Sequence, residues 1–157
     1  MDTLKIQKVI LRPNCTSQQL LEFESKFSIR IPVEYRVLLL NSNGLKFEPP
    51  FFYFSISSTE KDQISEFNSI EGIDFDINML KEDIEEGSNT YFYTDCLLPI
   101  AGTQYSGAWV FIGYKEPYLN KIYYADYDVV DENNVPILIK LADSLEDFFA
   151  AHGYYEK

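Results

Sequence analysis

The chain has 157 residues with 13 basic and 25 acidic side chains, which gives a formal net charge of −12 at pH 7. This length is typical of one domain, and a hydrophobic fraction of 46% with 16% aromatic residues argues against a disordered chain. The acidic balance argues against nucleic acid and anionic membranes as ligands, because both require a basic protein surface. A protein with a basic surface is the complementary partner, although acidic surfaces also serve solubility alone.

The charge is spread unevenly along the chain. Residues 1–50 carry 7 basic and 5 acidic side chains, residues 60–86 carry 2 and 10, and residues 87–157 carry 4 and 10. The start of the chain lacks the apolar region of a signal peptide, and no apolar run approaches the roughly 18 residues that span a bilayer. We therefore expect a cytoplasmic protein.

The two cysteines, Cys15 and Cys96, are far apart and form no pattern typical of a metal site. Two reduced, buried thiols are the expectation that the sequence favours, while a single disulfide between them and a redox role stay open.

The first expected helix lies within 15–27. Thr16 and Gln19 fit the capping box, in which each side chain accepts a hydrogen bond from the other residue's backbone N–H. Leu20, Phe23 and Phe27 follow at helical spacing and are expected to line one buried face.

The second expected helix begins at Pro32 and ends at Asn43-Gly44, which favour left-handed backbone. Its apolar side chains are expected to form one buried stripe and its charged side chains, Glu34 and Arg36, to face water. The stripe consists of Val33, Val37, Leu38 and Leu40.

Beyond residue 50 the pattern indicates strands. Candidates cover 51–56, 64–70, 97–103, 108–114, 120–130 and 135–142, with Pro136 at a strand start or a sheet edge. An acidic, mostly exposed helix is expected over 76–87, ending at Gly87, and a last helix over 144–153. Ser144 and Asp147 cap the last helix, and Gly153 ends it. These elements predict a single-domain α+β fold with one mostly antiparallel twisted sheet of about five or six strands, flanked by N-terminal, middle and C-terminal helices.

Candidate catalytic and metal-binding motifs are weak. The one histidine, His152, lies near a helix C-terminus, where the helix dipole is a sufficient reason for it. Asp74, Asp76, Asn78 and Glu85 partly imitate a calcium loop, but Met79 stands where the sharp turn needs glycine, so an acidic helix start explains them better.

Two further motifs fail. Gly102 and Gly107 have the separation of a phosphate-binding loop, but Ala108 and Trp109 replace its lysine and hydroxyl residue. Carboxylate pairs such as Asp126 and Asp128 do not distinguish a catalytic acid from a base. We therefore expect no catalytic residues, no metal and no cofactor.

The strand candidate over 120–130 offers a surface for a partner. Alternation places Tyr123, Ala125, Tyr127 and Val129 on one face, and the other face is expected to show a tyrosine among carboxylates. The alternative, an ordinary solvated strand face, has equal weight. The preceding hairpin loop carries one further tyrosine near its tip. The candidate partner-binding residues are Tyr118, Tyr124, Asp126, Asp128, Asp131 and Glu132.

The segment 31–44, "IPVEYRVLLLNSNG", resembles the signature of the SUKH superfamily, which includes the Smi/Knr regulators of cell-wall synthesis. The preceding segment is similar to the family's first helix, and 144–154 is similar to its closing helix with an aromatic pair. The positions that match are Ile31, Pro32, Glu34, Tyr35, Leu39, Asn43, Gly44, Phe148 and Phe149.

This resemblance implies an α+β fold without enzymatic activity. Many bacterial members look like immunity proteins, which bind and neutralise a cognate secreted toxin domain, often a nuclease. Since a nuclease is basic where it holds phosphates, the acidic charge favours the same function by occlusion of that surface. The alternative is a Smi/Knr-like regulatory module that binds an intracellular protein. A third class, an acidic hydrolase, requires a metal or a buried carboxylate pair. The toxin's identity and the oligomeric state stay open.

Overall fold

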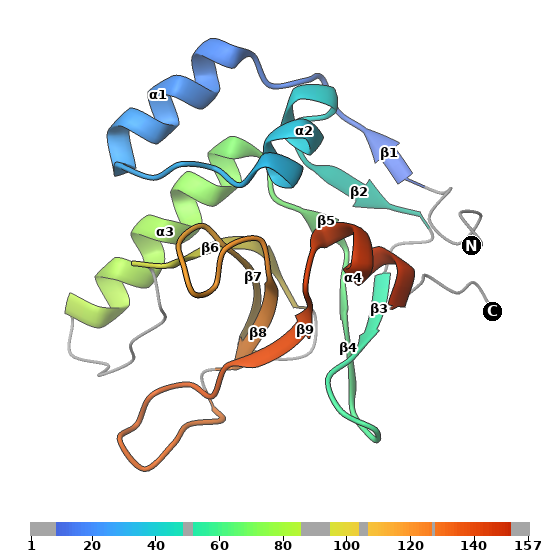
Figure 1. Ribbon diagram of the computed structural model, residues 1–157, viewed down its shortest axis with the longest axis vertical. Coiled ribbons are helices and arrows are strands. Elements are labelled where there is room, and N and C mark those ends of the chain that lie inside the picture. Colours follow the sequence, from blue (N-terminus) through green and yellow to red (C-terminus); the bar gives the residue numbers. More distant parts are fainter. Residues whose placement is uncertain (1–8, 49–51, 86–94, 104–106, 127, 152–157) are drawn as a thin grey trace.

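The computed structural model describes residues 9–48, 52–85, 95–103, 107–126 and 128–151. The first half of the chain builds two helices, five short strands and one long helix (Figure 1). These elements are β1 (Val9–Leu11), α1 (Ser17–Phe27), α2 (Val33–Asn41), β2 (Leu45–Phe47), β3 (Phe52–Ser55), β4 (Lys61–Ile64), β5 (Glu66–Phe67) and α3 (Ile70–Glu85). The second half adds β6 (Leu97–Gly102), β7 (Ala108–Gly113), β8 (Ile122–Asp126), β9 (Ile139–Ala142) and α4 (Leu145–Ala151).

The strands pair antiparallel throughout, which confirms the expected α+β fold. Their hydrogen bonds divide them into three sheets rather than one, with orders β1-β2-β5, β3-β4 and β6-β7-β8-β9. The strands β1 and β2, and all of β4 except Ile64, lie where no strand was expected. Because each has only three or four residues, none is long enough to show a two-residue period in the sequence.

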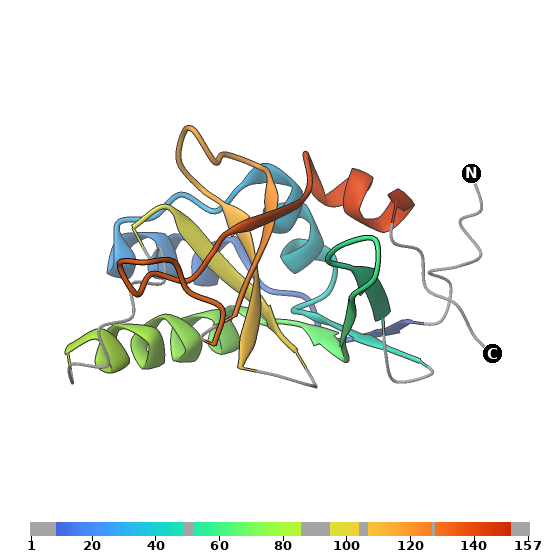
Figure 2. The same ribbon diagram turned by 90° about the horizontal axis from the view of Figure 1, so that it is seen from below.

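The four-stranded sheet is covered on both faces, and every residue of β7 is buried. Val110, Ile112 and Tyr124 belong to the larger hydrophobic cluster, whereas Phe111 and Tyr123 belong to the smaller one. Among the helices, α3 contacts the β6 edge of this sheet and α4 contacts the β9 edge (Figures 1 and 2). The sheet therefore lies between two hydrophobic clusters, one on each of its faces.

Helix α1 forms as expected. The hydroxyl of Thr16 accepts a hydrogen bond from Gln19 N at 3.1 Å, and the side chain of Gln19 accepts one from Thr16 N at 2.8 Å, so the capping box is confirmed. Leu20 and Phe23 are buried and Phe27 is partly buried. The predicted apolar face is therefore confirmed.

Helix α2 follows Pro32 as expected, but the prediction of its buried face is wrong. Val33 is 70% exposed and Val37 is 52% exposed, while Tyr35 and Leu39 are fully buried. The helix is turned this way because the hydroxyl of Tyr35 reaches inward and donates a hydrogen bond to the carbonyl oxygen of Asn68.

The end of α2 also differs from the expectation. The helix ends at Asn41, and the capping residue Ser42 is extended. Of Asn43 and Gly44, only Gly44 has a positive φ, 91°. A Cβ on Gly44 would lie 2.7 Å from the carbonyl oxygen of Phe67, so this position requires glycine for space as well as for conformation.

Helix α3 begins at Ile70, six residues before the expected start at 76, and it is not mostly exposed. Ile70, Ile73, Ile77 and Leu80 follow at helical spacing and are buried. Of the strand expected over 64–70, only the pair in β5 and the last residue of β4 are extended. The expected helix end at Gly87 lies outside the described residues.

The four strands β6 to β9 lie within the expected ranges, but β8 ends at Asp126 rather than at 130 and β9 begins at Ile139 rather than at 135. Pro136 forms an isolated bridge with Val130 before β9. The hydroxyl of Ser144 accepts a hydrogen bond from Asp147 N at 3.0 Å, so the predicted cap of α4 is confirmed. Tyr127, His152 and Gly153 lie outside the described residues. Within the described ranges, no helix combines the length and the apolar character that crossing a membrane requires.

Candidate partner-binding surface

The signature segment 31–44 connects α2 to the starts of two other helices. The carboxylate of Glu34 accepts hydrogen bonds from Leu145 N at 2.9 Å and Glu146 N at 3.1 Å, so it caps the N-terminus of α4. The side chain of Asn43 accepts one from Ile70 N at 2.9 Å and so caps α3. Glu34 is thus half-buried between two helices, and the expectation that it faces water is wrong.

None of the signature residues is exposed. Ile31, Pro32 and Leu39 are buried, and Phe148 and Phe149 stack against the rings of the core. These side chains hold the helices onto the sheets, which is a structural role. These side chains therefore offer little exposed surface for binding.

Tyr124 does not lie on a solvent face, so the expectation for this residue is wrong. Its side chain is 5% exposed, packs edge-on against Phe54 at 5.9 Å between ring centroids, and donates a hydrogen bond to Asp62 at 2.9 Å. The reason is that β8 is an inner strand of a sheet that is covered on both faces. The alternation of side chains along β8 therefore separates residues of one hydrophobic cluster from residues of the other, and does not separate buried from exposed residues.

The acidic residues that follow Tyr124 gather on the connection between β8 and β9, which we call the acidic loop (residues 128–138). Asp126, at the base, accepts a hydrogen bond from Asp128 N at 2.9 Å. Asp131 accepts two, from Asn133 N at 2.8 Å and Val135 N at 3.0 Å. These turns, together with the bridge between Val130 and Pro136, give the loop a defined shape.

The carboxylates of the acidic loop form no ion pair with the described residues. Asp128, Asp131 and Glu132 are exposed. Within the described part of the chain, ion pairs join Arg12 to Glu66, Lys26 to Asp74, Arg36 to Glu24 and Lys140 to Asp143, and none of them involves the loop. The loop therefore presents a negative field to solvent.

Two apolar side chains lie among these carboxylates, and the sequence did not single them out. Val129, which was expected to face inward, is 47% exposed, and Ile137 is 43% exposed. The two are neighbours, because Ile137 N donates a hydrogen bond to Val129 O at 2.9 Å. The turn signal at Asn133-Asn134, between the apolar segments 129–130 and 135–138, was the available hint of this arrangement.

Tyr118 lies at the other end of the sheet from the acidic loop. It is in the β7–β8 connection, which joins the strand ends where Ile112 pairs with Ile122, whereas Asp126 ends β8 opposite Ala108. Its ring packs edge-on against Tyr123, with 5.5 Å between centroids. The structure therefore unites Asp126, Asp128, Asp131 and Glu132 but does not bring Tyr118 or Tyr124 to them.

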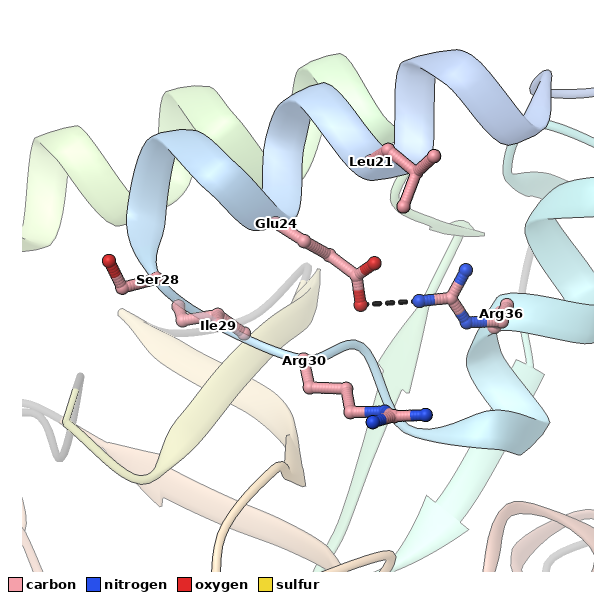
Figure 3. A pocket seen from close by; sticks show the side chains of 6 residues that line it. All are labelled: Leu21, Glu24, Ser28, Ile29, Arg30 and Arg36. Carbon is pink, nitrogen blue, oxygen red and sulfur yellow. Dashed lines mark hydrogen bonds and ion pairs between the residues drawn. The ribbon is translucent and has the colours of Figure 1, made fainter.

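A shallow pocket of about 720 Å³ lies between α1 and α2 and is basic rather than acidic. Figure 3 shows the carboxylate of Glu24 reaching from α1 towards Arg36 on α2, with Arg30 below them. Glu24 also accepts a hydrogen bond from Ile31 N at 2.8 Å, so its main role is to join the two helices. The charge of this pocket therefore does not complement a cationic partner. The pocket is lined by Leu21, Glu24, Ser28, Ile29, Arg30 and Arg36.

The described residues offer little for metal or nucleophilic chemistry. They contain no group of three side chains able to hold a metal ion. Asp74 and Asn78 lie on successive turns of α3 and are joined by a hydrogen bond of 2.9 Å, which confirms a helix in place of a calcium loop. Burial and the neighbouring Asp95 raise the pKa of Cys96 to about 12, and burial raises the pKa of Cys15. Both shifts oppose the thiolate that a nucleophilic cysteine requires.

Comparison with known proteins gives one result. The model of the SMI1 / KNR4 family (SUKH-1) matches residues 14–151, which include the four helices and all strands except β1. No curated protein matches the chain. The matched range covers the signature helix, the caps that it provides and the closing aromatic pair. The chain therefore belongs to the SMI1 / KNR4 family (SUKH-1).

Proposed function

We propose that this protein is an immunity protein that binds a cognate toxin domain and blocks it by covering a cationic active-site surface. A nuclease is the class of toxin that fits best, because an enzyme that holds phosphates presents lysine and arginine side chains there. The observation that carries the proposal is the acidic loop, whose exposed carboxylates Asp128, Asp131 and Glu132 form no ion pair within the described residues.

The loop has the composition that an interface needs. Charge alone steers a partner and fixes its orientation, but the gain from ion pairs is largely offset by desolvation of the charged groups. The exposed pair Val129 and Ile137 adds apolar area in the middle of the carboxylates. The chain's family membership and its net charge of −12 support the same function. The toxin domain would be held without any catalytic step on this chain.

Co-expression with the toxin encoded beside the gene tests the proposal. We expect wild-type protein to rescue growth and to form a complex with the inactivated toxin domain on a sizing column. The variant Asp128→Lys/Glu132→Lys should lose both, because it reverses two charges whose carboxylates accept no hydrogen bond in the described residues. Failure of the wild type to rescue growth or to form a complex would contradict the proposal.

The matched control is Glu22→Lys/Glu60→Lys. It changes the net charge by the same amount, at exposed positions in α1 and in the β3–β4 turn, away from the acidic loop (Figure 1). We expect this control to rescue growth. If it fails equally, total charge rather than the acidic loop determines binding.

A regulatory module that binds an intracellular protein is the second candidate function. The observation that favours it is the exposed apolar pair Val33 and Val37 on α2, which lies beside Arg36 and away from the acidic loop. A toxin-like reading frame next to the gene favours the first function, and its absence favours the second.

A further inference from the structure

The acidic loop lacks an aromatic side chain, although tight interfaces depend on buried aromatic anchors. Tyr124, which was expected to supply one, is in the core. Among the aromatic side chains in the described ranges, only two are exposed, Tyr53 at 38% and Phe75 at 66%. Of the aromatic rings in the described part of the chain, Phe75 is thus the one that offers most of its surface to a partner.

Phe75 lies in α3 on a face that carries uncompensated acidic charge. With about 100° between successive residues, Glu71, Asn78 and Glu82 share this face with Phe75. Glu71 and Glu82 are exposed, and the described residues provide neither with an ion pair. Phe75 is therefore an exposed ring with a carboxylate one turn before it and another two turns after it.

The cations near α3 lie on a different side of the helix. Lys26 pairs with Asp74 at 2.7 Å, and Lys26 and Lys81 both lie over the ring of Phe27, at 5.1 and 5.5 Å from its centroid. Position 81 is about 120° around the helix from position 75. These lysines therefore face α1 and leave the side of Phe75 negative.

This face is rigidly supported. Ile70, Ile73, Ile77 and Leu80 anchor the opposite side of α3 in the two hydrophobic clusters. Asn43 caps the start of the helix and also donates a hydrogen bond to Glu71 at 2.8 Å. A ring held on such a helix loses little conformational entropy when it binds, which is what an anchor requires.

The charge around Phe75 selects its partner. A second copy of the chain would place Glu71 and Glu82 against like charges, and phosphates of nucleic acid or lipid would be repelled as well. An apolar cavity bordered by lysine or arginine side chains is the complementary surface. The same kind of partner is proposed above for the acidic loop.

We propose that the α3 face of Glu71, Phe75 and Glu82 is part of the toxin interface, with Phe75 as its aromatic anchor. This inference rests on the proposed function. Figures 1 and 2 both place the acidic loop on the same side of the molecule as the C-terminal half of α3, which carries Glu82, while Glu71 and Phe75 lie on the same helix face in its N-terminal half. Met79 of α3 and Leu138 of the loop pack against the same hydrophobic cluster. One partner with a cationic groove reaches both elements.

The test is the affinity of the inactivated toxin domain encoded beside the gene for wild type, Phe75→Ala and Val33→Ala, measured by titration calorimetry. Val33 is the matched control, since it is also a helical apolar residue and is 70% exposed. Both variants should keep wild-type stability, because exposed side chains contribute little to it. Phe75→Ala should weaken binding about tenfold or more, and Val33→Ala by less than about threefold.

Two other results overturn the inference in distinguishable ways. If wild type binds and Phe75→Ala weakens binding by less than about tenfold, or by no more than Val33→Ala does, α3 is not the anchor and the proposed function stands. If wild type does not bind the toxin domain, the proposed function fails and the inference fails with it.

Discussion

The hydroxyl of Tyr124 on β8 donates a hydrogen bond of 2.9 Å to the carboxylate of Asp62 on β4, 62 residues earlier in the chain. Both side chains are buried, with 5% and 4% of their surface exposed. Because β8 and β4 belong to different sheets, this bond joins the β3–β4 hairpin to the four-stranded sheet. Tyr124 is therefore a residue of the fold rather than of a partner surface.

Removal of that hydroxyl should destabilise the protein without affecting partner binding. Tyr124→Phe leaves a buried carboxylate without one of its donors, which costs about 1–3 kcal/mol of unfolding free energy. Denaturant titration measures this loss. Tyr118→Phe, at a half-buried tyrosine near the surface, is the control and should change stability by less than about 0.5 kcal/mol. Loss of toxin binding with unchanged stability in Tyr124→Phe would contradict this assignment.

The cap that Glu34 provides for α4 predicts a second loss of stability. Glu34→Ala removes the acceptor for Leu145 N and Glu146 N and also a negative charge from a helix N-terminus. We expect a loss of about 1–2 kcal/mol in the free energy of unfolding, and a smaller loss for Glu34→Gln, which keeps one acceptor oxygen. Glu60→Ala, at an exposed turn, is the control for the removal of a carboxylate. Equal stability of Glu34→Ala and this control would show that the cap contributes nothing.

At the junction between α1 and α2, we predict that removal of Glu24 lowers stability more than removal of Arg36 does. Glu24→Ala leaves both Ile31 N and the guanidinium of Arg36 without their acceptor, so we expect a loss of about 2–3 kcal/mol. Arg36→Ala should cost less, because Glu24 then keeps its bond to Ile31 N. Thermal and denaturant unfolding of both variants and of the double variant measures the coupling. A larger loss in Arg36→Ala than in Glu24→Ala would contradict this geometry.

The cysteines predict how stability changes at alkaline pH. In the unfolded chain a thiol ionises near its ordinary pKa of 9.0, whereas burial raises the pKa of Cys96 to about 12 in the folded protein. The folded state therefore binds the extra proton between these values, so this contribution to stability is complete below pH 9.0 and is lost as pH rises towards 12. In Cys96→Ser, stability should fall less steeply over this range than in wild type.

Alkylation gives an independent check on the same residue. Native protein at pH 8 should react very slowly with iodoacetamide at Cys96, whereas denatured protein should react at once. Rapid labelling of the native protein would show that the thiol is neither buried nor protonated.

The sequence predicted those features of the fold that depend on neighbouring residues. The caps at Thr16 and Ser144 were predictable because each side chain accepts a hydrogen bond from a backbone N–H three residues ahead. The sequence pattern therefore contains both partners of the bond. The signature segment predicted the family for a related reason. Its residues contact many elements, so few substitutions fit them.

Features that depend on distant parts of the chain could not be predicted. The side chains of β8 do alternate between the two faces of the sheet, as predicted. Because hydrophobic clusters cover both faces, this alternation does not indicate which side chains are exposed to solvent. The orientation of α2 depends on Asn68, 33 residues after Tyr35. Of the candidate site, the loop carboxylates were found from sequence, because they lie within seven residues of one another. The exposure of Phe75 was not predicted from the sequence, because α3 was expected to begin at 76, after this residue.

The association rate of the inactivated toxin domain as a function of ionic strength tests the central claim most directly. Stopped-flow measurement should show this rate falling about tenfold or more between roughly 0.05 and 0.5 M salt. Asp128→Lys/Glu132→Lys should lower the rate at low salt, and Glu22→Lys/Glu60→Lys should lower it much less. A rate that does not change with salt, or that both variants lower equally, would contradict binding through the acidic loop.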